Sequence, residues 1–112
     1  MDLKEYQKLC KNSAKKFRNK EKEIMTWGLG IAGEAGDVAG CIKKTHGQGG
    51  DQKKGTKENL GDNLWYIAMI CNFYGWDLED VMEENIKKLK KRHPKGFSLK
   101  GYGKVKRKDW NK

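Results

Sequence analysis

Apolar residues recur at steps of three and four along most of the chain, which is the spacing of one face of an α-helix. This spacing predicts helices over residues 3–17, 23–44 and 56–74, and a fourth helix between Asp77 and Pro94. Four helices joined by short connections predict an all-α, four-helix-bundle-like fold. The residues expected to face inward on the fourth helix are Leu78, Val81, Met82, Ile86 and Leu89.

The ends of these helices carry residues suited to capping. Asp2 can accept a hydrogen bond from the first turn of the first helix, and Gly75 can adopt the left-handed conformation that ends the third. Residues 47–55 (GQGGDQKKG) are polar and rich in glycine, so a loop is expected there. Because residues 95–112 show no period, we expect a single domain over residues 1–94 and a basic tail over residues 95–112.

Composition permits only a thin hydrophobic core. Hydrophobic and charged residues each make up 36% of the 112 residues, but four tryptophans, four tyrosines and three phenylalanines argue against a disordered chain. Association of subunits would enlarge such a core. No apolar run approaches the ~20 residues of a membrane span, and the N-terminus lacks the apolar stretch of a secretory signal. A cytoplasmic protein with three free cysteines is therefore expected.

The net charge of +10 is distributed unevenly. The ends are basic, with +5 over residues 1–22 and +11 over residues 87–112, whereas residues 23–86 carry −6. A basic protein is by default a candidate for binding nucleic acid or a membrane surface. An acidic middle between basic ends also suits a metal ion beside a polyphosphate, and an ordinary solvated surface with a basic tail is the third interpretation.

Two pairs of acids lie at helical spacing. Glu34 and Asp37 are three residues apart on the second predicted helix, and Glu58 and Asp62 are four apart on the third. Apolar residues flank both pairs, so the carboxylates are expected beside the core. Four converging carboxylates repel one another unless cations join them, and hard divalent ions such as Mg²⁺ prefer oxygen ligands. Acids at this spacing also occur by chance, so the spacing alone leaves a solvated face open.

Residues 28–33 (GLGIAG) match the GxGxxG pattern of dinucleotide-binding proteins, which indicates such a site only between a strand and a helix. The chain shows no alternating strand pattern, so we do not expect a dinucleotide fold. Each glycine inside a helix costs about 0.8–1 kcal/mol relative to alanine. Close approach of another helix, access for a ligand or a kinked segment would each explain the five glycines between residues 28 and 40.

Polar and basic residues recur along one face of the fourth predicted helix. Asn85, Lys88 and Arg92 follow one another at steps of three and four, beside the apolar stripe. They could hold phosphate groups, or they could be ordinary solubility charges.

The acidic pairs and this basic face occur in a specific order. They lie within GLGIAGEAGDVAGCIKK (residues 28–44) and KENLGDNLWYIAMICNFYGWDLEDVMEENIKKLKKRHP (residues 57–94). Together these stretches resemble the MazG-like nucleotide pyrophosphohydrolases, an all-α family of nucleoside triphosphate pyrophosphatases, from Thr26 to Phe97. The family pattern is an ExxE pair, then an ExxD pair, then Asn-x-x-Lys-Leu-x-x-Arg. Either acidic motif alone is weak, whereas the combination is specific.

The resemblance assigns the acids one by one, with two departures. Glu34 and Asp37 occupy the ExxE positions, where Asp37 replaces the usual glutamate, and Asp62 occupies the final position of ExxD. Asn59 stands where the ExxD glutamate is expected. Three hypotheses remain: Glu58 supplies the missing carboxylate, Asn59 binds through its neutral carbonyl, or activity is weakened or lost.

The resemblance implies hydrolysis of a nucleoside triphosphate, with a deoxynucleotide preferred, to the monophosphate and pyrophosphate. It implies Mg²⁺, or Mn²⁺ in its place, with Glu34 and Glu58 as catalytic carboxylates. The implied metal ligands are Glu34, Asp37, Glu58, Asn59 and Asp62. The implied substrate contacts are Trp27, Lys44, Tyr66, Asn85, Lys88 and Arg92, with Lys43 and Trp65 as alternatives. Core packing is a competing explanation for the aromatic residues. Members of the family form dimers or tetramers, so a homodimer or homotetramer is expected.

Two other functions compete with this one. A small nucleic-acid-binding protein could use the basic tail, where Phe97, Tyr102 and Trp110 are interspersed with lysines. A nucleotide-binding module without activity could keep the fold, and Asn59 supports it. The base and sugar preference, the choice between dimer and tetramer and the role of the tail cannot be read from the sequence. Nucleic acid is the less favoured partner, and no membrane partner is expected.

Overall fold

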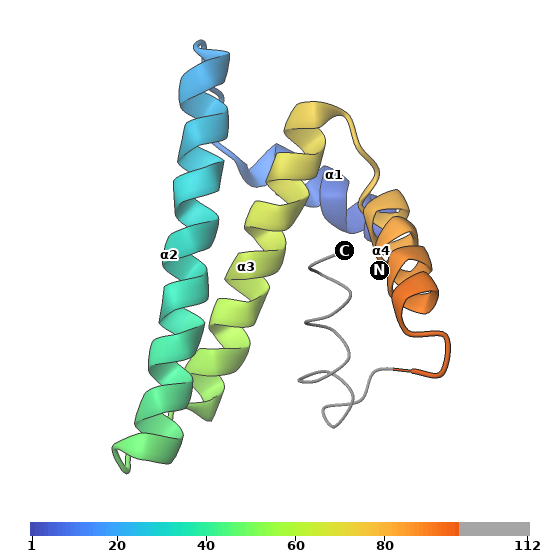
Figure 1. The fold of residues 1–112 in the computed structure, drawn as a ribbon. Helices are drawn as coiled ribbons and strands as arrows, with labels where there is room; N and C mark the ends of the chain where they lie inside the picture. The colour runs from blue at the N-terminus through green and yellow to red at the C-terminus, as the bar shows by residue number, and fades with distance from the viewer. Residues whose placement is uncertain (97–112) are drawn as a thin grey trace. The chain divides into compact units, whose positions relative to one another are not determined.

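The computed structural model describes residues 1–96, and these residues form four α-helices and no strand (Figure 1). The helices are α1 (Leu3–Ser13), α2 (Lys20–Gly47), α3 (Lys53–Tyr74) and α4 (Leu78–Arg92). The all-α prediction is confirmed. Nearly all of the predicted basic tail lies outside the described residues. The chain divides into two compact units, residues 1–79 and 80–112, which are described separately below.

The first helix ends earlier than its apolar spacing predicts. Asp2 caps α1 as expected, because its Oδ1 accepts a hydrogen bond from the Glu5 backbone N–H at 2.8 Å. The helix stops at Ser13, not at residue 17, since Ala14 has extended backbone angles (φ −84°, ψ 147°). The Ser13 hydroxyl donates to the Cys10 carbonyl at 2.8 Å, a local bond that competes with helix continuation. Phe17 therefore reaches the core from a connecting segment.

The middle helices are longer than predicted. Helix α2 begins at Lys20 because the Asn19 side chain accepts a hydrogen bond from the Lys22 N–H at 3.1 Å. It ends at Gly47, and α3 begins at Lys53, so the predicted loop shrinks at both ends. The C-terminal prediction for α3 is confirmed, since Gly75 has φ 73° and its N–H bonds to the Asn72 carbonyl at 3.3 Å.

The core of residues 1–79 lies where α1, α2 and α3 meet. Its buried members are Cys10, Trp27, Ala68 and Met69, each at most 4% exposed. The ring of Trp27 contacts those of Phe17 and Trp65 edge-on, with centroids 5.5 and 5.3 Å apart. Such edge-to-face pairs add to the free energy of burying the rings. The core is thin, as the composition predicted.

A buried glutamine links α1 to the end of α3. Gln7 is 7% exposed, and its Nε2 donates to Asn72 Oδ1 at 3.1 Å and to the Trp76 carbonyl at 3.0 Å. Its Oε1 accepts from the Leu78 N–H at 2.8 Å. Asn72 Nδ2 also donates to the Gln7 carbonyl at 3.0 Å. All four side-chain polar atoms of Gln7 and Asn72 are therefore hydrogen-bonded, which offsets the cost of burying them.

The predicted apolar face of α4 is only partly buried. Leu78 is 5% exposed, but the other four residues expected to face inward are not buried. Those residues are Val81 (38% exposed), Met82 (49%), Ile86 (50%) and Leu89 (38%). That part of the prediction is wrong, because a helical period identifies an apolar face without identifying what covers it.

The three cysteines are unpaired, as predicted. None of the helices within residues 1–96 is long and apolar enough to cross a membrane.

Candidate metal centre

Helices α2 and α3 run side by side and approach closely at two places (Figure 1). A Cβ atom added at Gly30 of α2 would collide with the ring of Tyr66 on α3. A Cβ added at Gly55 of α3 would lie 3.2 Å from the Sγ atom of Cys41 on α2. At the same end, the backbone N–H of Gln52 donates to the Thr45 hydroxyl at 2.9 Å. Close helix approach therefore explains Gly30.

The other glycines of α2 are in a different situation. A Cβ added at Gly28, Gly33, Gly36 or Gly40 would meet no atom of the described part of the chain within 4 Å. No kink is needed to accommodate them, because residues 20–47 form one continuous helix.

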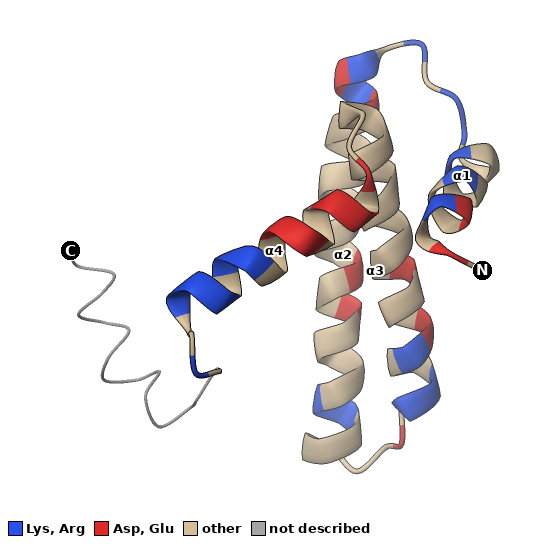
Figure 2. Cartoon of the chain, turned by 90° about the vertical axis from the view of Figure 1, so that its right-hand side faces the viewer, with Lys and Arg blue, Asp and Glu red and all other residues tan. Residues whose placement is uncertain are grey.

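The predicted acids of α2 and α3 lie between the two close contacts. Figure 2 shows the acidic segments of α2 and α3 at a similar level of the paired helices. Partial desolvation raises the pKa of the Glu34 carboxyl, and the negative charges of Asp62 and Asp37 raise it further. Glu34 is half-buried, whereas Asp37 and Asp62 are exposed. The two helices thus bring three of the predicted carboxylates into one electrostatic field.

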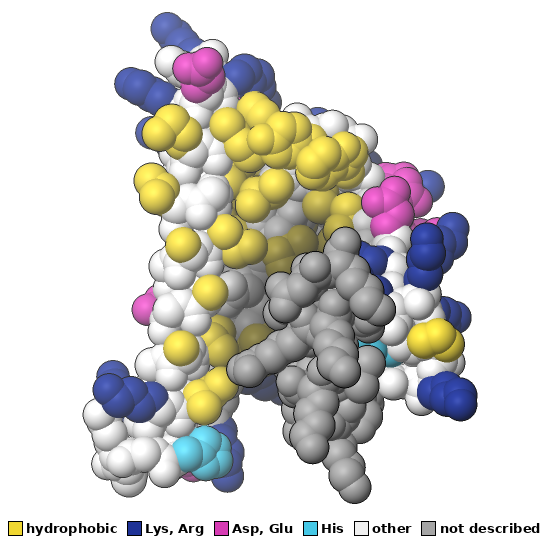
Figure 3. Space-filling model, in the orientation of Figure 1, with side chains coloured by type: hydrophobic (Ala, Val, Ile, Leu, Met, Phe, Trp, Pro, Cys, Tyr) yellow, Lys and Arg dark blue, Asp and Glu magenta, His cyan; other side chains and the backbone are white. Residues whose placement is uncertain are grey.

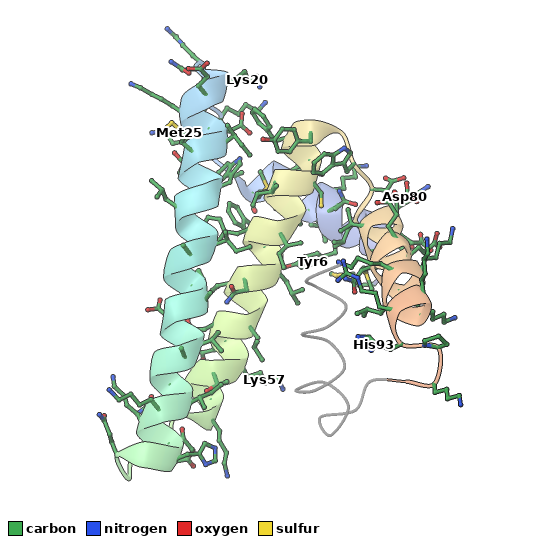
Figure 4. The ribbon with its side chains drawn as sticks, in the orientation of Figure 1. Tyr6, Lys20, Met25, Lys57, Asp80 and His93 are labelled. Atoms are coloured by element: carbon green, nitrogen blue, oxygen red, sulfur yellow. The ribbon has the colours of Figure 1, made fainter. Side chains whose placement is uncertain are left out.

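Tyr6 of α1 belongs to the same group (Figure 4). Sequence reasoning missed it, because the only signal was its position on an apolar helical face. Burial is the main cause that raises the pKa of the Tyr6 phenol from 10.0 to about 12. A hydrogen bond with Cys10 raises this pKa as well, and so do the charges of Cys10 and Asp62. The charge of Asp62 therefore raises the pKa of one group on α1, Tyr6, and of one group on α2, Glu34.

Glu58 and Asn59, the two candidates for the missing ligand, point in different directions. Glu58 is exposed, and it is not among the charges that shift the pKa of Glu34. Asn59 is half-buried, and its Nδ2 donates to the Sγ atom of Cys41 at 3.4 Å. The backbone carbonyl of Asn59, which is not the side-chain carbonyl proposed as a ligand, accepts a hydrogen bond from the Asn63 side chain at 2.8 Å. Of the two, Asn59 faces α2.

The donor chemistry suits a magnesium ion that shares its coordination with a substrate. Within residues 1–96, no three His, Cys, Asp or Glu side chains are close enough together to hold a metal ion by themselves. Mg²⁺, however, keeps several waters and is usually held by one or two carboxylates plus substrate phosphates. Glu34, Asp37 and Asp62 offer the hard oxygen atoms that this arrangement requires.

The predicted aromatic substrate contacts lie in the core. Trp27 is 4% exposed, and its Nε1 donates to Glu23 Oε2 at 3.1 Å. Tyr66 is half-buried, with its ring centroid 6.1 Å from that of Trp27 and 5.1 Å from that of Trp65. Their contact with a nucleotide stays a prediction.

The three basic residues and the one asparagine predicted to contact the substrate are all exposed. Lys44 lies in the last turn of α2. Asn85, Lys88 and Arg92 lie on α4, whose first half is acidic and whose second half is basic (Figure 2). These four residues also stay predictions.

Comparison with known proteins gives two matches. The family model described as MazG nucleotide pyrophosphohydrolase domain matches residues 10–97. The gene 37 protein of Mycobacterium phage L5 is 34% identical over 84 residues, which cover 67% of this chain and 69% of the phage protein. No solved structure matches the chain at a significant level.

Proposed function

The chain belongs to the MazG nucleotide pyrophosphohydrolase family, and from this premise we propose that it hydrolyses a nucleoside triphosphate to the monophosphate and pyrophosphate. A deoxynucleoside triphosphate is the expected substrate, and Mg²⁺ the expected cofactor, with Mn²⁺ able to replace it. One observation carries the proposal: the charges of Asp37 and Asp62 act on the Glu34 carboxyl and raise its pKa. These acids lie on α2 and α3, between the two places where the helices approach closely.

We assign Glu34, Asp37 and Asp62 as the residues that would hold the cation. A bound cation would supply charge neutralisation on the phosphate oxygens and a more acidic water. Glu34 is also assigned to orient the attacking water or accept its proton, because it is the one half-buried carboxylate of the three. Asp37 and Asp62, which are more exposed, are assigned to binding the cation.

Basic and polar side chains are assigned to the phosphates. Lys44 at the end of α2 would stabilise negative charge on the departing pyrophosphate. The contacts of Lys88 and Arg92 with phosphate, which the family resemblance implies, stay predictions. The Asn85 amide would donate a hydrogen bond to the nucleotide.

A screen of the eight common nucleoside triphosphates with Mg²⁺ tests this function, with pyrophosphate and orthophosphate measured separately. We expect pyrophosphate from at least one nucleotide and no release after EDTA is added. Orthophosphate as the main product would contradict the proposal. Nucleotide binding without turnover would favour the inactive module, and salt-sensitive DNA binding without turnover would favour the nucleic-acid-binding protein.

We also propose a homodimer or homotetramer, since large apolar side chains are exposed along α2 and α3. They include Met25, Leu29, Ile42, Leu60 and Leu64, which are 47–72% exposed. Figure 3 shows separate apolar side chains along α2 and a group of them over the upper end of α3 on the same face. Apolar side chains that gather on an exposed face can mark an interaction site. Light scattering should give a mass of two or four times the 12.9 kDa chain, and a monomer at micromolar concentration would contradict the proposal.

A further inference from the structure

Helix α4 presents an apolar stripe that is exposed after Leu78. Every residue from 79 to 92 is exposed. Within residues 1–96, no ion pair joins an acidic side chain of α4 to a basic one. The large apolar side chains of the exposed stripe are Val81, Met82, Ile86 and Leu89, which are 38–50% exposed. The helix therefore offers both an apolar face and unpaired charges to a partner.

The charges of α4 are divided between its two halves (Figure 2). Residues 79–84 contain four acidic side chains and no basic one, whereas residues 87–92 contain five basic side chains and no acidic one. The exposed stripe runs from Val81 to Leu89, so its midpoint is residue 85, between the two halves. A second α4 that runs antiparallel about this midpoint places each acidic half beside a basic half. A parallel one would place like charges together.

We propose that the exposed stripe of α4 binds the same stripe of a second copy of this chain, with the two helices antiparallel. The contact is isologous, because a two-fold axis near residue 85 relates the two helices. It covers the apolar stripe of each copy and sets the acidic half of each beside the basic half of the other. The inference does not depend on the proposed function. It adds a second contact to the association proposed for α2 and α3.

Glu79 and Lys90 report on the direction of this pairing. They are eleven residues apart, close to three helical turns, so both lie on the same edge of the stripe. Within one helix they are about 16 Å apart along the axis, too far for an ion pair. In the antiparallel pair, Glu79 lies about one residue from the level of Lys90 in the second copy. The opposite edge carries the predicted substrate contacts Asn85, Lys88 and Arg92, which the test leaves unchanged.

The test measures the mass of the full chain against concentration, by sedimentation equilibrium at low salt. Glu79→Lys and Lys90→Glu should each weaken association about tenfold, because the two-fold axis turns two attractive contacts into two repulsive ones. The variant with both substitutions should associate as tightly as the wild type. An equimolar mixture of the two single variants should do the same, because each charge then meets an opposite one.

Matched controls separate this contact from a general effect of charge. Asp80→Lys and Lys87→Glu make the same charge changes on the side of α4 away from the stripe, and they should alter association by no more than about twofold. Replacing both Met82 and Leu89 by glutamine removes apolar surface but keeps every charge, and it should weaken association at least about tenfold. Glutamine favours helix, and circular dichroism checks that each variant is folded.

A wild type that remains a single chain at every concentration would overturn the inference. Single reversals without effect, or a double reversal that associates as weakly as they do, would exclude the antiparallel pair. A stripe that packs against its own chain, or association through α2 and α3 alone, would leave the mass of all these variants equal to that of the wild type. That result would overturn the inference as well.

Discussion

Replacement of Asp62 by alanine is expected to lower pyrophosphate release by at least about a hundredfold. Asp62 is the α3 carboxylate whose charge raises the pKa of both Glu34 on α2 and Tyr6 on α1. Its removal would take away the α3 carboxylate that lies in the electrostatic field of Glu34. Initial rates at saturating Mg²⁺ measure the loss, and a partial recovery at much higher Mg²⁺ would show that the defect is in cation binding.

Two further variants are needed to interpret the rate of Asp62→Ala, one as a control and one as a comparison. Asp80→Ala removes an exposed aspartate of α4 that has no part in the site, and its rate should stay within about twofold of the wild type, as for most surface substitutions. Glu58→Ala compares the exposed glutamate with Asp62. A loss as large as that of Asp62→Ala would assign the missing carboxylate to Glu58. More than about a tenth of the wild-type rate in Asp62→Ala would contradict its assignment as a ligand.

The existence of the helices could be predicted from apolar spacing, but some of their ends could not. Asp2 and Gly75 act through their own backbone neighbours, so sequence alone was enough to predict both caps. The end of α1 depends on Ser13, whose hydroxyl bonds to the Cys10 carbonyl before the apolar pattern reaches Phe17. Phe17 fits the helical period by position and reaches the core from outside the helix.

For the acids too, spacing within one helix could be predicted from the sequence, whereas contacts between helices could not. Steps of three and four were enough to predict that Glu34 and Asp37 share a face of α2. The same steps could not choose between Glu58 and Asn59, because both lie within one turn of Asp62. The choice of which one faces α2 depends on a contact with Cys41, eighteen residues away along the chain. Cys41 itself could have been noticed, since it follows Glu34 by two helical turns.

The charge distribution gave correct information about surfaces but none about the arrangement of elements. It predicted a basic second half of α4, which the structure shows (Figure 2). It could not show that four of the five apolar residues on that helix are 38–50% exposed. Burial depends on a partner surface, and a helical period contains no information about that partner.

Replacement of Trp27 by alanine is expected to lower the free energy of unfolding by about 3–5 kcal/mol. Trp27 is 4% exposed and joins the rings of Phe17, Trp65 and Tyr66, so its loss leaves a cavity among α2, α3 and the α1–α2 connection. The Glu23 carboxylate would also lose its indole donor. Urea denaturation, followed by circular dichroism, measures the change.

Trp76→Ala is the matched control, because this tryptophan is 53% exposed and, among residues 1–96, its ring stacks only on that of Tyr74, with centroids 4.7 Å apart. Its free energy of unfolding should change by no more than about 1 kcal/mol. Equal losses for the two variants would contradict the assignment of Trp27 to the core. If Trp27→Ala kept its stability but had a raised KM, the result would show that Trp27 contacts the nucleotide and does not stabilise the core. Stability and KM measured on the same variant therefore separate the two roles that spacing along α2 left open.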